Sequence, residues 1–347
     1  MDSLTQIVLG SGVASAVIGR QIGRRAVAWG ALCGTLPDLD VLVRFADPVA
    51  QFTYHRSASH SLLVLTVLTP LLVWLARRVH GPQLASRGRW FLALWLALIT
   101  HPLLDALTVY GTQLWWPLTD YPVSIASVFI IDPLYTLPLL AAMVLVWRQR
   151  GSAASVRWNN VALAVSSLYL LWGGGAKLWT EHRVQADLVR QQVQAERVLT
   201  VPAAFTTLLW RVVVIDGDRF REGFYSLVDG DAAPHWGPWQ PRHAELLAPL
   251  AGHWPVARLQ SFTHGFYAAA VDGAGRVSIS DLRMGQQGQY FFSFVVGQQA
   301  ADGSVSALPT QRAARDTDGR ALGWQWQRLW NAATPWPETN AQATDLY

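Results

Sequence analysis

The first half of the chain is a succession of long apolar stretches separated by short polar connections. A bilayer span needs about 20 mostly apolar residues. Residues 4–19 are short and rich in small residues, and residues 26–45 contain a proline and two aspartates, so these two either span among close-packed neighbours or reach only half the depth. Four other stretches approach the full length, namely residues 61–76 with their flanks, 90–107, 124–147 and 160–179. The pattern predicts four to six membrane segments.

The pattern changes after residue 180. Residues 181–200 are charged and rich in helix-forming residues, so we expect a helical stalk there. From Val201 onward, short β-branched and aromatic runs such as LLWRVVVI and YFFSFVVG alternate with turn signals such as DGDR and DGAGR. We therefore predict an α-helical polytopic membrane domain over residues 1–180 and a small antiparallel β-rich extramembrane domain over residues 201–347. Six or seven strands are expected, with WQWQRLW as a closing helix or strand.

Charge supports this division of the 347 residues. Only 14% are charged, against about 25% in a soluble domain. Residues 1–180 hold 7 acidic and 13 basic side chains, whereas residues 181–347 hold 16 and 14. The net charge of +4 therefore comes from the apolar half, which indicates membrane orientation and a lipid bilayer as partner rather than nucleic acid. The lone Cys33 excludes an internal disulfide, and no removable signal peptide is expected.

Basic residues indicate the orientation of the predicted segments. Connections with excess Lys and Arg stay on the cytoplasmic side. Ten of the thirteen cations of the first half occupy alternate connections, at Arg20, Arg24, Arg25, Arg77, Arg78, Arg87, Arg89, Arg148, Arg150 and Arg157. We therefore expect residues 46–60, residues 108–123 and everything after residue 180 to face outward.

Eight further ionisable residues of the first half gather on that same outward side. They are Asp38, Asp40, His55, His60, His101, Asp105, Asp120 and Asp132. Ionisable groups at membrane depth are costly, and by default they mark a functional site. Each also has a plainer interpretation: a histidine packed in the core, a helix-capping Asp38 or Asp132, or an Arg56 that forms a structural ion pair.

Spacing favours a metal site. His101 and Asp105 are four residues apart, so a helix presents both on one face to one cation. His55 and His60 are five apart and cannot point the same way from one helix. Ser57 and Ser59 are candidate N-caps, which places His55 in the preceding loop and His60 in the first helical turn.

A broken helix adds two carboxylates to this set. In GTLPDLD, Gly34 and Pro37 interrupt the helix just before Asp38 and Asp40. A broken helix at membrane depth is tolerated where it lines a polar cavity.

Several motifs together resemble a known family. MDSLTQIVLG, GTLPDLD, YHRSASHSLL, THPLLDALTVYGTQLWWPLTD and FIIDPLY are similar, in order, to the YdjM-like bacterial predicted membrane-bound metal-dependent hydrolases. The likeness is dense over residues 1–180, and the second half resembles the C-terminal part of longer members. It implies a multi-pass protein of the bacterial inner membrane, a divalent metal and hydrolytic chemistry. The motif positions carry over to Asp38, Asp40, His55, His60, His101 and Asp105.

One departure and one fainter likeness qualify this resemblance. Many relatives have a histidine in the opening motif where this chain has Gln6, so a ligand is either missing here or replaced by the glutamine in another role. A fainter similarity to helical zinc-dependent phospholipase C enzymes suggests a phosphoester substrate.

The leading hypothesis is a hydrolase that acts through a metal-activated water, with zinc as the expected ion and manganese as the alternative. We expect His60, His101 and Asp105 to be ligands, with Asp38 and Asp40 as further ligands or one of them as general base. His55 and Arg56 would then orient or neutralise an anionic, amphiphilic, lipid-like substrate.

The alternative is a non-catalytic membrane protein that binds or moves a metal ion or small solute, with the β domain as a docking module. The inner halves of the later segments hold no ionisable residue, which argues against a conduit. The sequence does not define an oligomeric state.

Overall fold

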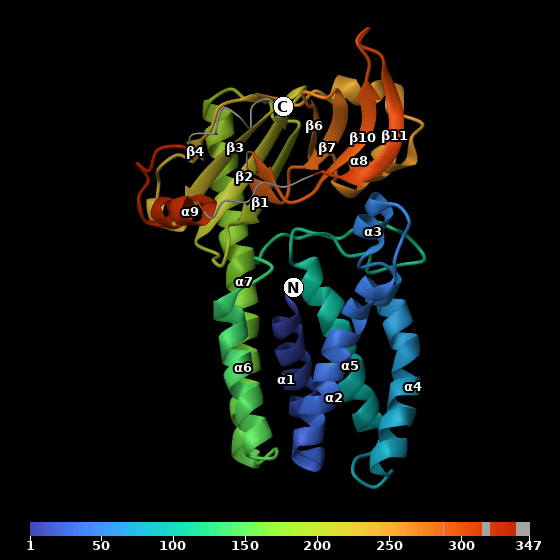
Figure 1. The fold of residues 1–347 in the computed structure, drawn as a ribbon. Coiled ribbons are helices and arrows are strands. Elements are labelled where there is room, and N and C mark those ends of the chain that lie inside the picture. The colour runs from blue at the N-terminus through green and yellow to red at the C-terminus, as the bar shows by residue number, and fades with distance from the viewer. Residues whose placement is uncertain (287, 314–319, 338–347) are drawn as a thin grey trace. The chain divides into compact units, whose positions relative to one another are not determined.

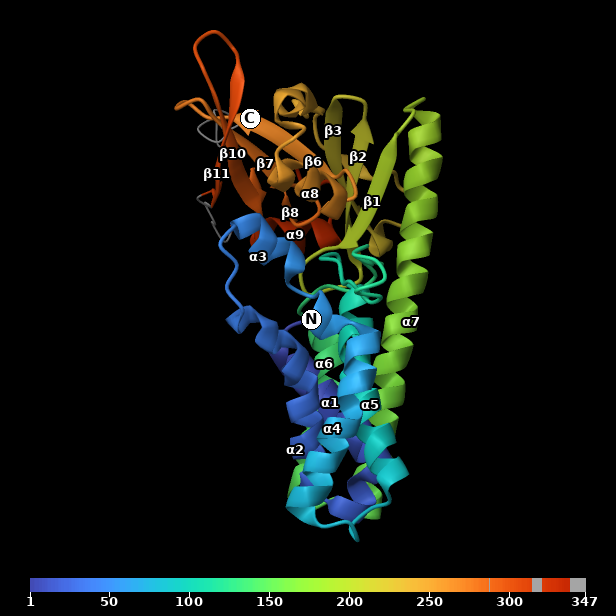
Figure 2. The same cartoon turned by 90° about the vertical axis from the view of Figure 1, so that its right-hand side faces the viewer.

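The computed structural model describes residues 1–286, 288–313 and 320–337, and its internal contacts divide the chain into two compact units. The helical unit comprises Met1–Val43 and His55–Gly174. The β unit combines Arg44–Tyr54 with the described residues from Gly175 onward. Figures 1 and 2 show both units, and each is described by itself. The predicted order, a helical region followed by an antiparallel β domain, is confirmed.

The helical unit is built around α1 (Ser3–Ile22), which contacts α2 (Arg24–Thr35), α5 (Arg87–Ala106) and α6 (Pro133–Arg148). Asp2 caps α1 by accepting a hydrogen bond from the backbone N–H of Thr5. The remaining elements of the unit are the 3-10 helices η1 (Leu36–Leu42) and η2 (Ala58–His60), α4 (Leu62–His80) and the first part of α7 (Ala153–Arg190).

Glycines bring α1 and α2 into backbone contact. A Cβ atom built on Gly30 would lie 2.3 Å from the carbonyl oxygen of Gly10, and one on Gly34 would lie 2.3 Å from the carbonyl oxygen of Gln6. Gly30 and Gly34 are four residues apart and share a helix face, the spacing that lets helices approach closely in lipid. The contact at Gly34 lies in the last turn of α2, directly before η1 begins.

Among the described residues, two helices, α4 and α7, are long and apolar enough to cross a membrane, and α6 is a shorter apolar helix. The expectation of four to six segments therefore stays a prediction. The predicted segment 124–147 differs from the structure because its helix begins only at Pro133, where Asp132 caps α6 and accepts bonds from the N–H groups of Leu134 and Tyr135. Proline suits the first helical position, since it has no N–H to leave unpaired.

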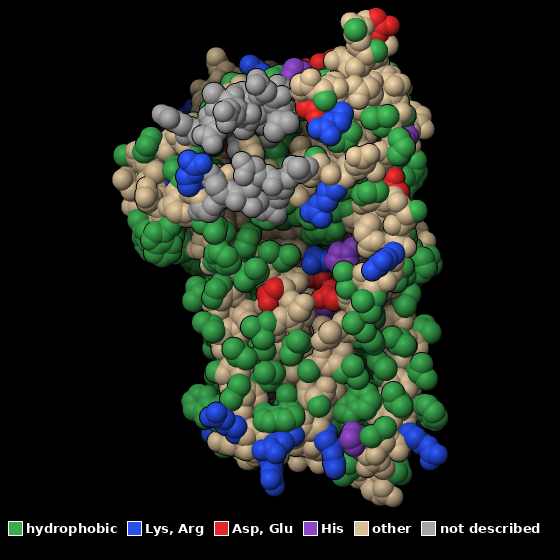
Figure 3. Space-filling view, viewed as in Figure 1, with side chains coloured by type: hydrophobic (Ala, Val, Ile, Leu, Met, Phe, Trp, Pro, Cys, Tyr) green, Lys and Arg blue, Asp and Glu red, His purple; other side chains and the backbone are tan. Residues whose placement is uncertain are grey.

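The two ends of the helical unit differ in charge. Basic side chains gather at the end where the α1–α2, α4–α5 and α6–α7 connections lie. Acidic and histidine side chains are visible at the opposite end (Figure 3). The ionisable residues predicted to share one side of the membrane domain therefore lie away from most of its basic connections.

The β unit contains two main sheets. One has the order β1-β2-β3-β4, with β5 also paired to β3, and the other has the order β11-β10-β7-β6; β8 pairs with β9. All these pairs are antiparallel. The strands are β1 (Arg197–Pro202), β2 (Leu209–Asp216), β3 (Arg219–Ser226), β4 (His235–Trp236), β5 (Gln240–Pro241), β6 (Tyr267–Val271), β7 (Arg276–Asp281), β8 (Gly285–Gln286), β9 (Gln289–Tyr290), β10 (Ser293–Gln299) and β11 (Val305–Arg312).

Seven of these described strands have five or more residues, which agrees with the six or seven expected. The two-residue strands β4, β5, β8 and β9 were not predicted. The helices of the unit are α3 (Pro48–Tyr54), η3 (Leu227–Asp229), η4 (Ala244–Leu250), α8 (Trp254–Phe262) and α9 (Arg320–Trp330). The closing aromatic motif WQWQRLW is thus a helix rather than a strand.

Strand β2 buries both of its faces. Val213 and Ile215 join a core that includes residues of the second sheet, whereas Val212 and Val214 pack with Val184 of α7 on the other side. This alternation follows from the two-residue period of a strand. The predicted stalk over residues 181–200 needs correction, because α7 ends at Arg190, residues from Arg197 form β1, and the helix is part of the β unit's core.

Helix α3 belongs with the β unit, although the sequence placed it within residues 1–180. The Phe52 ring lies 5.0 Å from the ring of Phe262 and 4.4 Å from that of Phe292. Aromatic packing therefore explains why a connection between two helical segments is part of the other unit.

The glycine contact predicts the effect of adding one methyl group. In Gly30→Ala the added methyl group meets backbone atoms of α1, which cannot move aside as a flexible side chain can. We therefore expect the variant to be less stable by about 1–3 kcal/mol. The measurement is the thermal unfolding midpoint in detergent, which should fall. Gly175→Ala is the matched control, since no described atom lies within 4 Å of its added Cβ. Equal midpoints for the two variants would show that the contact does not limit stability.

Candidate metal centre

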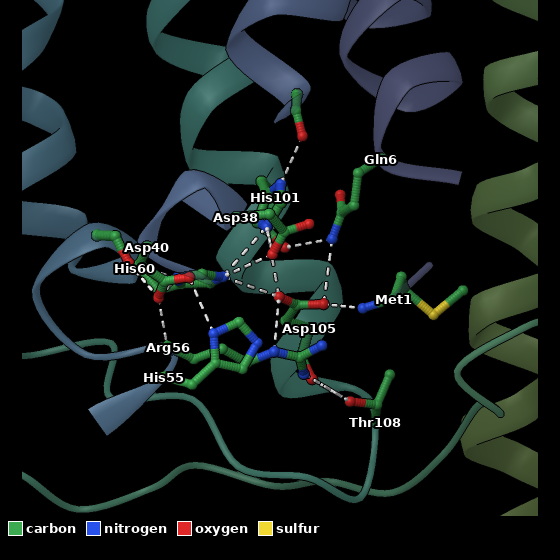
Figure 4. Close-up of polar contacts among 12 residues, drawn as sticks. Met1, Gln6, Asp38, Asp40, His55, Arg56, His60, His101, Asp105 and Thr108 are labelled. Atoms are coloured by element: carbon green, nitrogen blue, oxygen red, sulfur yellow. Dashed lines mark hydrogen bonds and ion pairs between the residues drawn. The ribbon is translucent and has the colours of Figure 1, made fainter. Parts of the chain in front are cut away.

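Four side chains from three elements converge near the end of α5 (Figure 4). Asp38 comes from η1, His60 from η2, and His101 and Asp105 from successive turns of α5. One ligand atom from each lies within 4.8 Å of the others. The pair predicted from the spacing in α5, His101 and Asp105, therefore lies in the same group as Asp38, which the broken helix presents.

The local sequence explains how His60 reaches this point. The histidine ends η2, and Ser61 then caps α4 by accepting a hydrogen bond from the N–H of Val64. Ser57, one of the two expected caps, takes the N-cap position of η2, and His60 lies in that single helical turn. Ser61 caps the α4 helix that follows. His55 lies in the preceding turn, as expected.

The distances within the group suit a tetrahedral ion. The Nε2 atoms of His60 and His101 are 3.2 Å apart. Asp105 Oδ2 lies 3.2 Å and 3.4 Å from these two nitrogens, and Asp38 Oδ1 lies 3.5 Å and 3.4 Å from them. Four tetrahedral ligands bound at about 2.0–2.1 Å are separated by about 3.3–3.4 Å. The group could therefore bind one metal ion.

Burial makes a cation at this position favourable. His60, His101 and Asp105 have fully buried side chains, whereas the Asp38 side chain is 21% exposed. Asp105 Oδ2 has no hydrogen-bond partner among the described residues. Because a buried carboxylate oxygen that accepts no hydrogen bond costs free energy, its position facing two imidazole nitrogens is consistent with metal ligation.

Both imidazoles are held at the nitrogen that points away from the group. His101 Nδ1 lies 2.7 Å from the carbonyl oxygen of Gly34, which can only accept. His60 Nδ1 lies 2.9 Å from Ser59 Oγ, and that hydroxyl in turn donates to Asp40 at 2.8 Å. A proton on each Nδ1 leaves each Nε2 lone pair facing the other ligands, the usual outer-shell arrangement of a metal-binding histidine.

Gln6 supports the same group. Its amide Nε2 donates to Asp105 Oδ1 at 3.1 Å and to the carbonyl oxygen of His101 at 3.2 Å. The N-terminal amine of Met1 also contacts Asp105 Oδ1. Asp105 is therefore held through Oδ1 while Oδ2 faces the imidazoles, and Gln6 acts as a hydrogen-bond donor to the group.

Asp40 is engaged by the loop that carries His60. It accepts from His55 Nδ1 at 2.9 Å and from the backbone N–H of Arg56 at 3.0 Å, as well as from Ser59. Asp40 therefore lies beside the four-residue group and organises the loop, and His55 is one of its hydrogen-bond partners.

Arg56 borders the group from the other side. Its Nε lies 3.4 Å from Asp105 Oδ2, its Nη1 donates to Thr108 at 3.4 Å, and its guanidinium lies 4.9 Å from the Tyr110 ring centre. The residue is buried and has a φ of 63°, which is uncommon outside glycine. Residues held in such conformations cluster at functional sites.

Two of the aspartates that were expected to face outward do not join the cluster. Asp132 caps α6 and accepts from the Tyr169 hydroxyl, in line with its plainer interpretation, and Asp120 lies exposed in a loop. The five later histidines, His182, His235, His243, His253 and His264, lie in the β unit and are exposed or partly exposed.

Comparison with known proteins adds the family. Residues 1–180, about half of the chain, match the YdjM inner membrane protein family. The chain belongs to this family. YfhP of Bacillus subtilis (strain 168), described as an uncharacterized protein, is 25% identical over 233 residues, which cover 64% of this chain and 68% of YfhP. No solved structure gives a significant match. The family's description indicates an inner membrane protein, and the matched region contains the whole candidate centre.

Sequence reasoning missed the residues that position the ligands. The sequence indicated Ser59 only as a helix cap, but its hydroxyl contacts His60 Nδ1. It indicated Gly34 only as a helix breaker, but the Gly34 carbonyl orients His101. Backbone acceptors have no signature in sequence. Thr108 and Tyr110, which contact Arg56, lie three and five residues after Asp105 in the same motif. Their position in the sequence could therefore have indicated that they lie near the site.

Metal content provides the first test. Purified protein is expected to hold one divalent ion per chain by elemental analysis, and His60→Ala and His101→Ala are expected to lose it. Gln6→Ala should weaken binding by about 10–100-fold, the usual effect of removing an outer-shell partner. His182→Ala is the control, because its exposed side chain lies outside the cluster. Metal retained by both ligand variants would contradict the assignment.

Proposed function

We propose that this YdjM-family protein is a membrane-bound metal-dependent hydrolase acting on an ester or phosphoester of an amphiphilic substrate. The observation that carries the proposal is the unequal burial of four candidate ligand atoms, whose imidazole–imidazole and imidazole–carboxylate distances suit a tetrahedral ion. Three are enclosed, and the fourth, on Asp38, is partly exposed. Catalytic sites keep a position accessible, whereas structural sites are closed.

Zinc is the ion we expect, with manganese as the alternative. Two imidazole nitrogens and two carboxylate oxygens suit a borderline cation. An octahedral ion bound at about 2.0–2.1 Å would space adjacent ligands by about 2.9 Å, less than the 3.2–3.5 Å found for the imidazole–imidazole and imidazole–carboxylate pairs. A bound divalent ion supplies Lewis-acid chemistry, polarising the ester oxygen and making water a stronger nucleophile.

The residues of the chain then divide into three roles. His60, His101 and Asp105 hold the ion, because all three are enclosed and their other atoms are occupied by protein partners. Asp38, which is accessible, takes the proton from the attacking water. Arg56 and His55 offer positive charge and hydrogen bonds to an anionic substrate group.

Position supports the substrate class. The centre lies at the end of the helical unit away from most of its basic connections, and those connections are expected on the cytoplasmic side. We infer that the site opens toward the periplasm near the lipid boundary, where a phospholipid or lipid-linked substrate is within reach. Four to six segments crossing the inner membrane complete this proposal.

A second candidate is non-catalytic metal binding. It is favoured by the presence of four protein ligands, since a tetrahedral ion with four protein ligands has no open position. In that case Asp38 is a permanent ligand and the β unit is a docking module.

Asp38→Asn separates the two candidates. In the hydrolase, the variant keeps its metal and loses about 10²–10⁴-fold in kcat, the usual contribution of a general base. In a closed site, the variant loses metal affinity and the wild type cleaves nothing. The measurements are metal content and turnover of phospholipid and water-soluble phosphodiester or carboxylic ester substrates. Equal rates on lipid and soluble substrates would remove the support for an amphiphilic substrate.

Arg56→Lys tests recognition of an anionic group. Lysine keeps the charge but loses the planar fork that binds phosphate through two hydrogen bonds. We expect KM to rise for phosphoester substrates and to change little for neutral esters, with metal content retained. A uniform loss of kcat on both substrate types would show that Arg56 serves the fold and not the substrate.

A further inference from the structure

Helix α9 of the β unit exposes an uncharged apolar stripe. Leu322, Trp326 and Trp330 recur every four residues, and their side chains are 48%, 64% and 56% exposed. The rings of Trp326 and Trp330 contact each other edge to face, with centroids 5.8 Å apart. Exposed tryptophans in such a row are unusual for a surface in water and typical of a binding surface.

The orientation of α9 is fixed by its opposite face. Arg328 is buried and pairs with Asp229 of η3, and it also donates to the carbonyl oxygen of Phe224 at the end of β3. Ser226 Oγ donates to the carbonyl oxygen of Leu329 at 2.9 Å. The stripe therefore faces outward because the buried ion pair holds the other side of the helix against the sheet.

Helix α7 contacts the β1-β2-β3-β4 sheet at the end where β3 finishes, which is also the end that α9 contacts. Trp179 donates from its indole nitrogen to the hydroxyl of Tyr225, the neighbour of Phe224 in β3. Lys177 donates to the carbonyl oxygen of Thr200 near the end of β1. The same end exposes further apolar side chains: Leu178, Phe205 and Val228. Figure 3 shows hydrophobic side chains gathered over the α9 end of the unit.

The course of α7 indicates that this end of the sheet lies next to the bilayer. The helix runs unbroken from Ala153 to Arg190 and, in the part of the chain that the structure describes, is one of two helices apolar and long enough to span a membrane. Its apolar part precedes Lys177, and its charged part follows. The end of the sheet that receives Lys177 and Trp179 is therefore the end at which the chain leaves the bilayer, and tryptophan is enriched at that depth.

We propose that the stripe of α9 lies in the membrane interface and holds the β unit against the lipid surface through Leu322, Trp326 and Trp330. The stripe contacts lipid at the boundary between headgroups and acyl chains. Tryptophan suits this boundary because its ring is apolar and its N–H reaches water or headgroups. The proposal is independent of hydrolytic activity.

A fluorescent reporter tests the contact in the full chain. In a Cys33→Ala background, Trp326→Cys is labelled with an environment-sensitive dye, and the protein is placed singly in nanodiscs of phosphatidylethanolamine and phosphatidylglycerol. Ala301→Cys, exposed in the β10–β11 connection of the same unit, is the matched control. We expect quenching by a lipid with a nitroxide near its headgroup to be several-fold stronger at position 326 than at position 301.

A second reporter keeps the result independent of the label on α9. Val228→Cys is exposed at the same end of the sheet, and its quenching is expected to fall when Trp326→Gln and Trp330→Gln are combined. Equal quenching at positions 326 and 301 would overturn the proposal. So would a dye at position 326 that is shielded from aqueous iodide but unaffected by the lipid nitroxide, because the stripe would then be covered by protein.

Discussion

The candidate centre depends on the backbone contact between α1 and α2. With glycine at positions 10, 30 and 34, the two helices touch without intervening side chains. That contact places Gln6 on α1 within reach of Asp105, and the carbonyl of Gly34 within reach of His101. Two of the three enclosed ligands are thus oriented by atoms whose positions require this contact. Larger side chains at the contact would separate the helices and leave these ligands without their partners.

Electrostatics explains why so many donors surround so few carboxylates. A buried carboxylate needs hydrogen bonds or positive charge. Asp105 meets this need unequally, because Gln6 and the N-terminal amine serve Oδ1, whereas Oδ2 faces only imidazole nitrogens and, at 3.4 Å, Arg56 Nε. This asymmetry points toward a cation among the four ligands rather than toward a neutral polar core.

Particular residues show how far the sequence was informative. The four-residue spacing of His101 and Asp105 predicted that they share one helical face. Pro37 predicted the helix break that presents Asp38. Both predictions succeeded because the signals are local in the sequence. The roles of Gly34 and Ser59 were not predictable, since they depend on which atoms other elements bring near. The same limit applies to α3, which aromatic contacts distant in sequence join to the β unit.

Asp38 and Asp40 are two residues apart yet have different surroundings, and η1 is the reason. The 3-10 turn points one carboxylate at the imidazoles and the other at the turn around Arg56, where it accepts bonds from His55, Ser59 and the Arg56 backbone. Those bonds offset the left-handed backbone of Arg56, which otherwise costs about 1–3 kcal/mol. Asp40 therefore acts on the centre by holding Arg56 and His60 in place, and a single short helix supplies both a candidate ligand and the support for its neighbours.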